Sequence, residues 1–353
     1  MSLQSRRGGG LLSLLFLVGG AGFLCLPFLL VERQAPSLDG ADHARTLSEL
    51  DVPFATAVEE LAGEDPELDL RPWLGEHVDT YFGPGAARLV EHGLIDAKKL
   101  ELGRELYALN CAGCHADSGD GGGPAARWLA PRPRNFRKGK FKFTSTATGE
   151  RPLASDLLRT VTEGLAGSSM PSFKLWNAHA RESVVEYVRY LSMRGEFEEL
   201  ALQLARDDEE LPDPAEIFDL VRERWSPARL KRTFPAVPET TNDAASVERG
   251  RVLFNDPQRG SCFSCHGPLG RGDGPTAGDY KDDWGYPIRP RDFGAGVFRS
   301  GNDSQALYLA IATGIKGSPM GSFATMYSGP EIWDLVHFAQ HIAAQGKQGG
   351  QRP

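Results

Sequence analysis

Four of the five cysteines in this 353-residue chain lie in two short motifs that also contain a histidine. Residues 111–115 read CAGCH and residues 262–266 read CFSCH. A C-x-x-C pair can bind zinc, act as a redox dithiol or attach a cofactor through its two sulfurs. Because the pattern occurs twice, 151 residues apart, we expect both copies to perform the same chemistry.

Zinc binding and dithiol redox chemistry leave parts of the motif unexplained. A structural zinc ion takes four ligands, and neither half of the chain contains a second cysteine pair. If the two pairs shared one zinc ion, both adjoining histidines would have no role. A thioredoxin-like dithiol is expected in a βαβ context, whereas each motif here follows a helical pattern.

Covalent attachment of haem uses every residue of the motif. In C-x-x-C-H, two thiols add to the vinyl groups of haem and the adjoining histidine binds the iron. Two motifs therefore predict two covalently bound haem c groups. The residues predicted to hold them are Cys111, Cys114, His115, Cys262, Cys265 and His266.

The second axial position of each iron determines its chemistry, because methionine, histidine or an open position support different reactions. Met170 lies in GSSMPSF, 55 residues after His115, and Met320 lies in GSPMGSF, 54 residues after His266. Their neighbours are turn formers rather than an apolar face, which argues against a role as core filler. We therefore predict that Met170 and Met320 bind iron.

The other methionines and three histidines are expected to be structural. Met193 and Met326 have no counterpart in the other half of the chain. The histidines follow the first methionine loop or lie on the last helix, where surface or satisfied helix positions are expected. They are His179, His337 and His341.

Helical patterns surround both motifs in the same order. An opening helix leads into each motif, and a closing helix with one apolar face follows each methionine loop. Tyr187 and Phe338 on the closing helices are 151 residues apart, and Met170 and Met320 are 150 apart. Two matched all-helical modules of about 100 residues each are predicted.

Outside the modules, the chain is acidic and interrupted by prolines. The charges and prolines of residues 196–242 predict a solvated, partly helical linker without a third buried core. The expected parts are a membrane anchor at 1–34, a lead segment at 35–95, the first module at 96–194, a linker at 195–243, the second module at 244–345 and a tail at 346–353.

The N-terminus predicts export with retention in the membrane. Residues 11–31 carry no charge, and a helix of that length spans a hydrocarbon core of about 30 Å. Arg6 and Arg7 precede it, which favours a cytoplasmic N-terminus. A cleaved signal peptide would have a shorter apolar core and a small-x-small site. We expect a single-pass protein of the bacterial inner membrane with periplasmic haem modules, in which Cys25 is a plain apolar residue.

With these features, each module resembles a class I c-type cytochrome domain. The resemblance covers roughly residues 96–194 and 244–345. It implies that the opening and closing helices cross where a glycine meets an aromatic residue. The implied pairs are Gly103 with Tyr187 and Gly250 with Phe338.

The loops after the motifs extend the resemblance, since they end in P-R-N-F and P-R-D-F. The family implies that a proline carbonyl here accepts the proton of the haem-ligating histidine, which matches Pro133 and Pro290. Arg134 and Arg291 occupy equivalent places and are expected to pair with haem propionates. Most of the other basic residues between Arg127 and Lys142 are expected to form a solvated charged loop, with a docking patch for an acidic partner as the alternative for the rest.

The resemblance implies a membrane-anchored dihaem electron carrier without catalytic residues, working between a respiratory donor and a periplasmic or membrane acceptor. Its partners would be redox proteins such as a respiratory oxidase or dehydrogenase complex. The net charge of −8 argues against nucleic acid. The alternatives are a dihaem enzyme, such as a cytochrome c peroxidase or thiosulfate dehydrogenase, and a gas-binding protein. Both need a haem with an exchangeable or open sixth position.

Overall fold

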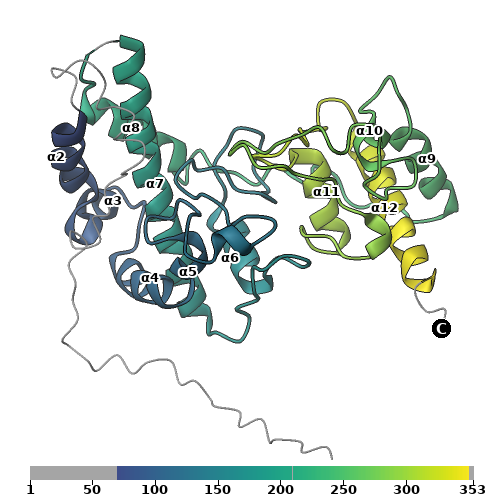
Figure 1. Ribbon diagram of the computed structural model, residues 1–353, viewed down its shortest axis with the longest axis horizontal. Coiled ribbons are helices and arrows are strands. Elements are labelled where there is room, and N and C mark those ends of the chain that lie inside the picture. The colour runs from purple at the N-terminus through teal and green to yellow at the C-terminus, as the bar shows by residue number, and fades with distance from the viewer. Residues whose placement is uncertain (1–69, 209, 350–353) are drawn as a thin grey trace, which may run out of the picture. The chain divides into compact units, whose positions relative to one another are not determined.

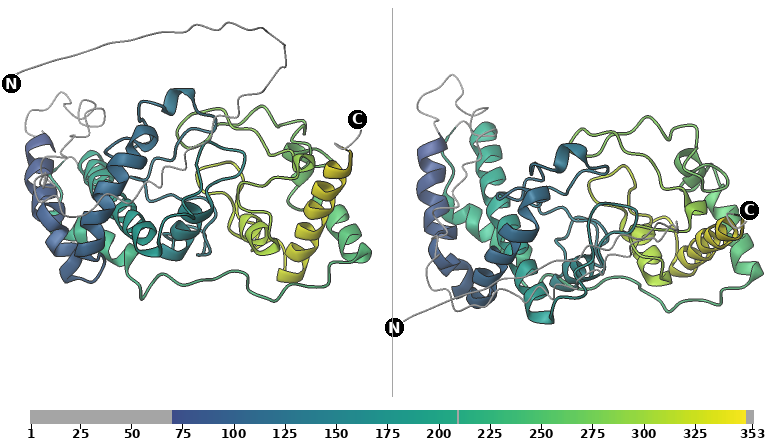
Figure 2. Two further views of the ribbon diagram at one scale, coloured as in Figure 1. Left: turned by 90° about the horizontal axis from the view of Figure 1, so that it is seen from below. Right: turned by 60° about the horizontal axis from the view of Figure 1, so that its bottom comes forward.

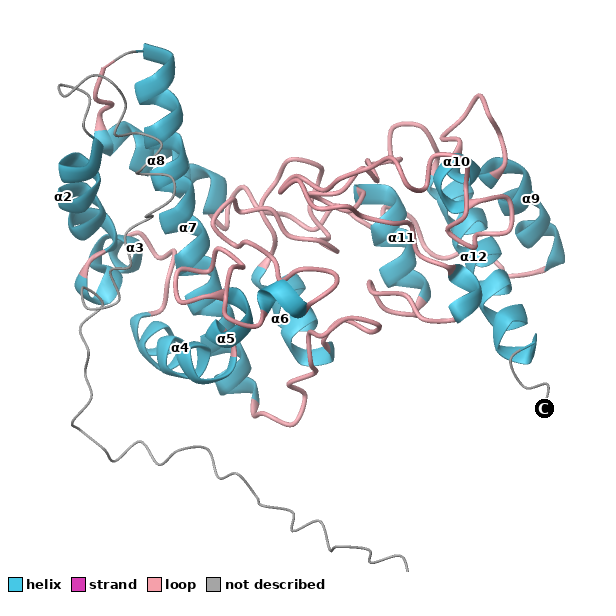
Figure 3. Ribbon diagram, in the orientation of Figure 1, coloured by secondary structure: helices cyan, strands magenta, loops and turns pink. Residues whose placement is uncertain are grey.

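The computed structural model describes residues 70–208 and 210–349, and these are helices joined by long loops (Figures 1 and 3). Within these ranges the only strand-like feature is an isolated bridge between Lys281 and Pro287. The described part is therefore all-α, as predicted. The expected anchor and Cys25 lie outside these ranges, and no helix within them is long and apolar enough to cross a membrane.

The helices, including three short 3-10 turns labelled η, follow one another along the chain. They are α2 (Leu70–Phe82), η3 (Pro84–Ala86), α3 (Ala87–Glu91), α4 (Ala97–Asn110), α5 (Ala112–His115), η4 (Ala126–Trp128), α6 (Ala154–Glu163), α7 (Ala178–Asp208), α8 (Pro214–Trp225), α9 (Ala244–Phe254), α10 (Cys262–His266), η5 (Phe293–Ala295), α11 (Ser304–Thr313) and α12 (Gly329–Gly349).

In the first module, α4 and α7 cross at a glycine. The α4 helix begins at Asp96, whose carboxylate accepts hydrogen bonds from the N–H groups of Lys98 and Lys99. At the crossing, a Cβ on Gly103 would overlap the Ser183 carbonyl and touch Tyr187. Only glycine lets the two backbones approach this closely.

The second module repeats this crossing with α9 and α12. Asp243 caps α9 by accepting from the N–H of Ser246. A Cβ on Gly250 would overlap the Asp334 carbonyl and lie 2.9 Å from the Cβ of Phe338. Both predicted glycine–aromatic pairs are thus confirmed.

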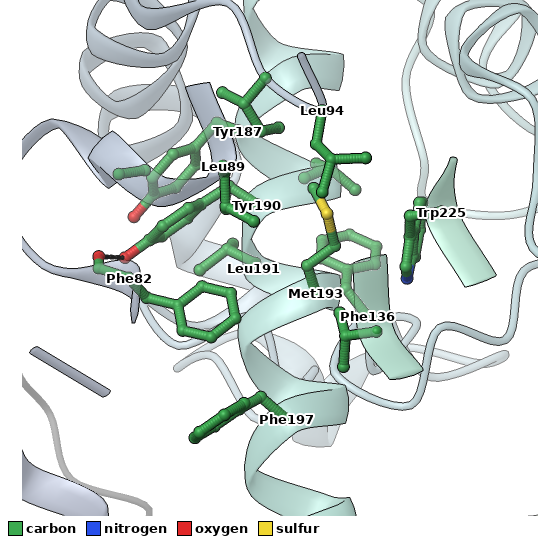
Figure 4. Close-up of a cluster of buried hydrophobic side chains, with 14 of the residues drawn as sticks. Phe82, Leu89, Leu94, Phe136, Tyr187, Tyr190, Leu191, Met193, Phe197 and Trp225 are labelled. Carbon is green, nitrogen blue, oxygen red and sulfur yellow. Dashed lines mark hydrogen bonds between the residues drawn. The ribbon is translucent and has the colours of Figure 1, made fainter. Parts of the chain in front are cut away.

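The first module continues into a helical extension that the second module lacks among the described residues. The α7 helix runs 31 residues, and its second half packs against α2 and α8. Phe82, Phe197 and Trp225 are fully buried there (Figure 4). The hydroxyl of Tyr190 donates a hydrogen bond of 2.8 Å to the Phe82 carbonyl, which ties α7 to the end of α2.

The expectation of a solvated linker from residue 195 is wrong where the second half of α7 and the α8 helix pack on the first module. Phe197, Ile217 and Val221 are buried in the same cluster as the first module's own core. Two of the acidic residues that suggest solvation, Glu196 and Glu198, are themselves paired with arginines. Glu196 accepts two hydrogen bonds of 2.6 Å from Arg151, so its charge is compensated inside the protein.

The remainder of the connection is helix-free and contacts both modules. Residues 226–243 run from α8 to α9 (Figure 2). The N–H of Thr233 donates to the Ser145 carbonyl of the first module at 2.8 Å. The indole N–H of Trp333 donates to the Val237 carbonyl at 3.2 Å, so this segment also packs on the second module.

Candidate functional site

Each C-x-x-C-H motif forms a single helical turn. In the first module, Cys111 ends α4, and α5 carries Cys114 and His115 on the next turn. The N–H of His115 donates to the Cys111 carbonyl at 2.9 Å. The second motif forms α10 in the same way. One turn therefore holds two thiols and an imidazole close together, as covalent haem attachment requires.

The loops after the two motifs fold back with matching hydrogen bonds. The N–H of Gly121 donates to the His115 carbonyl at 3.0 Å, and the N–H of Gly272 donates to the His266 carbonyl at 2.8 Å. Further on, Phe136 and Phe293 each donate a backbone bond of 2.7 Å to a loop glycine. The repeat seen in the sequence is thus a repeat of backbone structure.

The imidazole of His115 is oriented by its own loop. It stacks on Phe136 with ring centroids 4.5 Å apart, and its Nδ1 lies 3.0 Å from the Arg134 carbonyl. Pro133 was expected to supply this carbonyl. Instead, the Pro133 oxygen faces Gly121 and would lie 2.7 Å from a Cβ there. The acceptor is therefore one residue later than predicted.

In the second module, too, the carbonyl beside the histidine belongs to the residue after the expected proline. The Pro290 oxygen faces Gly272, at 2.8 Å from the position of an added Cβ. The ring of His266 packs on Phe293 with centroids 4.8 Å apart. Its Nδ1 is buried without a partner at hydrogen-bond geometry. Burial lowers the pKa of His266, and the nearby Arg291 backbone opposes this change, so Arg291 corresponds to Arg134.

The four motif cysteines are free thiols. Burial raises the pKa of Cys111 to about 12 and that of Cys262 to about 11. A redox dithiol needs a thiol whose pKa is lowered, so these environments favour neither thiolate nucleophiles nor reactive disulfides. Within the described ranges, no three His, Cys, Asp or Glu side chains cluster to bind a metal ion.

The two methionine loops are closed by the same backbone bond. The N–H of Leu165 donates to the Met170 carbonyl at 3.1 Å, and the N–H of Ile315 donates to the Met320 carbonyl at 2.8 Å. A serine two residues before each methionine accepts from its N–H, at 3.2 Å and 3.4 Å respectively. Both methionines are half-buried, so the structure holds them in equivalent positions.

The remaining sulfur and imidazole groups have structural surroundings. Met193 is fully buried among core side chains (Figure 4), and Met326 is 46% exposed. His337 is buried and lies 2.6 Å from the Ser246 hydroxyl. His179 and His341 are exposed. That none of the five is a ligand stays a prediction.

The basic segment 127–142 contains cations that pair within the chain and cations that are exposed, such as Arg127 and Arg132, so the docking patch stays a prediction. Arg137 forms a buried ion pair with Glu198 at 2.7 Å, and Lys140 pairs with Asp283 at 2.6 Å. Trp284 is a further partner, since Cζ of Arg134 stacks 4.2 Å from its ring centroid. No motif marks Asp283 or Trp284 as partners, since they belong to the other module.

The donor set fits a covalently held haem in each module. Each motif offers two free thiols. In the first module, the Arg134 carbonyl engages Nδ1 of His115, which leaves Nε2 for iron. In the second, the buried Nδ1 of His266 lies beside the equivalent backbone.

Comparisons with known proteins agree with this geometry. The profile of the family described as Cytochrome c matches residues 100–192 and 247–343. Among solved structures, a chain of the reducing HAO-like protein complex of Kuenenia stuttgartiensis is similar, with 30% sequence identity and a TM-score of 0.55. The similarity covers 69% of this chain and 96% of that chain. No curated protein sequence matches.

Proposed function

Because the chain belongs to the cytochrome c family, and is thereby a haem electron-transfer protein, we propose that it is a membrane-anchored dihaem carrier of single electrons. Each module would hold one haem c, which supplies a reversible one-electron iron couple when bound. The observation that carries this proposal is the equivalent closure of the Met170 and Met320 loops. It supports the same pair of axial ligands in both modules.

The chain's own residues would hold and tune the two haems. The thiols of Cys111 and Cys114 would hold the first haem, and Nε2 of His115 would bind its iron. The Arg134 carbonyl accepts the Nδ1 proton at 3.0 Å, which orients the ring and makes it a stronger donor. The second motif uses Cys262, Cys265 and His266 in the same roles.

Methionine on the opposite face favours electron transfer over substrate chemistry. A thioether raises the reduction potential of haem iron and occupies the position where peroxide or a gas would bind. Met170 and Met320 would do this in the first and second module respectively. A peroxidase or a gas-binding protein needs an open or exchangeable sixth position on at least one iron. Such a protein would not place a methionine ligand in both modules.

The similarity to a chain of an HAO-like complex supports a place within a larger oxidoreductase assembly. The uncharged residues 11–31 support a single membrane span, with the modules in the bacterial periplasm. The two modules would then lie between a respiratory donor and a periplasmic or membrane acceptor.

The test is the mass and redox behaviour of the protein purified from membranes. We expect the apoprotein mass plus two haems, two one-electron transitions, and no carbon monoxide binding in the reduced state. One haem, or none, would refute the dihaem proposal. Carbon monoxide binding or peroxidase turnover by the unaltered protein would favour an enzyme or a gas-binding protein.

The anchor has a separate test. N-terminal sequencing of the mature protein should begin ahead of residue 11, and replacing residues 1–33 with a cleavable signal should release a soluble dihaem protein. A mature chain that begins after residue 31 would show that the segment is a signal peptide.

A further inference from the structure

Arg134 and Arg291 each contact the other module with the end of the side chain, although Nε of Arg291 also donates to the Val297 carbonyl of its own module at 2.8 Å. The Arg134 carbonyl bonds His115 of its own module. Its guanidinium, however, stacks on Trp284 of the second module, with Cζ 4.2 Å from the ring centroid. A single residue thus contacts the histidine of one site and a loop of the other module.

The far end of each arginine lies against a methionine loop of the opposite module. Nη1 of Arg134 would be 2.6 Å from a Cβ on Gly317, and Nη2 of Arg291 would be 2.8 Å from a Cβ on Gly167. Each glycine lies three residues before its module's predicted methionine ligand. The contact is reciprocal, so it follows the internal repeat.

Both glycines have backbone conformations that suit this close approach. Their φ angles are +69° at Gly167 and +74° at Gly317, in the left-handed region that favours glycine. Each lies within the loop closed by the methionine carbonyl, at Leu165 to Met170 and at Ile315 to Met320. A side chain at either glycine would collide with the incoming guanidinium.

The region around Arg134 carries more positive than negative charge at close range. Nη1 of Arg134 and Nε of Arg299 are buried without hydrogen-bond partners. Lys142 is half-buried and close enough to both arginines to feel their charge. The nearby acids are Asp282, whose carboxylate accepts from the N–H groups of Trp284 and Tyr286, and Asp283, which is paired with Lys140 at 2.6 Å. Buried donors without partners are costly, which points to an anionic group bound by this cluster.

We propose that the two modules exchange their arginines, so that Arg134 binds the carboxylates of the haem in the second module and Arg291 binds those of the haem in the first. The inference rests on the proposed function. The exchange makes each arginine a binding residue of the other module's site. It also couples the two sites, because one residue orients a histidine of one and supplies charge to the other.

The expected sign follows from charge. A cation beside a haem favours the reduced iron, which carries one positive charge less than the oxidised iron. Arg134→Gln should therefore lower the potential of the haem in module 2 at least as far as that of the haem in module 1. Arg291→Gln should show the reverse pattern.

The experiment is a spectroelectrochemical titration of the full-length protein in which the two haems are told apart. A Met320→His background removes the sulfur-to-iron absorption band from module 2, so that the remaining band reports module 1. Arg134→Gln is compared with its parent in this background and in the corresponding Met170→His background. Arg127→Gln is the control, because Arg127 stacks on Trp128 within its own module at 4.8 Å.

Haem content is measured first. Loss of a haem bears on the proposed function, whereas a change of potential in the unexpected module bears on the exchange alone. With both haems present, a fall in module 2 equal to or larger than that in module 1 supports the exchange. Any other pattern, including no fall, overturns it. If Arg134→Gln does not accumulate, Arg134→Lys keeps the charge but loses the planar fork, and an unchanged potential in module 2 would count against the proposal.

Discussion

Modules 1 and 2 hold their motifs with matching backbone bonds but are supported by cores of different size. Among the described residues, the cluster around module 1 contains 31 buried apolar residues, whereas that around module 2 contains 13. The difference comes from α2, α3, α8 and the second half of α7. The site geometry therefore depends on the local repeat, while the stability of each module depends on what packs around it.

Buried polar contacts also differ between the modules. In module 1, Glu196 accepts from both Arg151 and the indole of Trp225, which joins a loop and α8 to α7. In module 2, the Ser246 hydroxyl bridges Asp334 and His337 between α9 and α12. The network in module 1 links that module to its helical extension, whereas the network in module 2 links two helices of the same module.

The largest expected effect comes from removing haem attachment. Cys262→Ala with Cys265→Ala should remove one haem and unfold module 2, because little other core remains there. Cys111→Ala with Cys114→Ala should remove one haem while the α2, α7 and α8 helices persist. Mass spectrometry and far-ultraviolet circular dichroism would measure both. Equal helix loss in the two variants would show that the extension does not support module 1.

Exchange of the proposed methionine ligands tests whether the two sites are equivalent. Met170→His and Met320→His should each lower the potential of one haem, because a thioether favours reduced iron more than imidazole does. Since both loops are closed in the same way, we expect shifts of similar size, measured by redox titration. Met326→His, at an exposed position, is the control. An unchanged potential in Met170→His would refute that ligand assignment.

Truncation of Trp225 tests the extension directly. Trp225 is fully buried, and replacing a buried tryptophan by alanine costs about 3–5 kcal/mol. Trp225→Ala should lower the unfolding transition of module 1 and leave that of module 2 in place, as followed by calorimetry. Leu220→Ala, at a partly exposed position of the same helix, should change stability by no more than about 0.5 kcal/mol. Equal shifts in both modules would contradict independent support.

The smallest expected effect is a pH dependence confined to module 2. Hydrogen bonds from Arg259 and from the Ser328 backbone lower the pKa of Glu331 from 4.5 to about 2. A lowered carboxyl pKa stabilises the fold above the unfolded value, and this contribution is lost as pH falls from 4.5 towards 2. Glu331→Gln should flatten the acid dependence of module 2 in that range. Glu91→Gln, at an exposed position, is the control, and a matching change there would contradict this assignment.

Much of the fold could be predicted because it repeats. The motif, the methionine loop and the glycine–aromatic crossing recur at nearly constant spacing, so each copy supported the interpretation of the other. The extension has no second copy. Its apolar contacts join α2 to α8 across more than a hundred residues, and the charges of Glu196 and Glu198 resembled those of a solvated linker. Their partners, Arg151 and Arg137, come from distant loops.

The sequence motif predicts which loop orients His115, but not which carbonyl of that loop accepts its hydrogen bond. The P-R-N-F segment located the loop beside the histidine, but the choice between neighbouring carbonyls depends on backbone rotation. Gly121 has a left-handed backbone conformation, with φ +83°, and this part of the loop packs against the Pro133 oxygen. The Arg134 carbonyl then faces the ring.

The amino-acid sequence by itself determined the chemistry of the two sites, because thiols and imidazoles at fixed spacing on one helical turn need no distant partner. Only the tertiary structure decided which loops meet across the modules. Arg134 and Gly317 are 183 residues apart, and no local pattern records the contact between them. The packing of the two modules decides which group a long arginine side chain contacts, and that packing is a property of the whole fold.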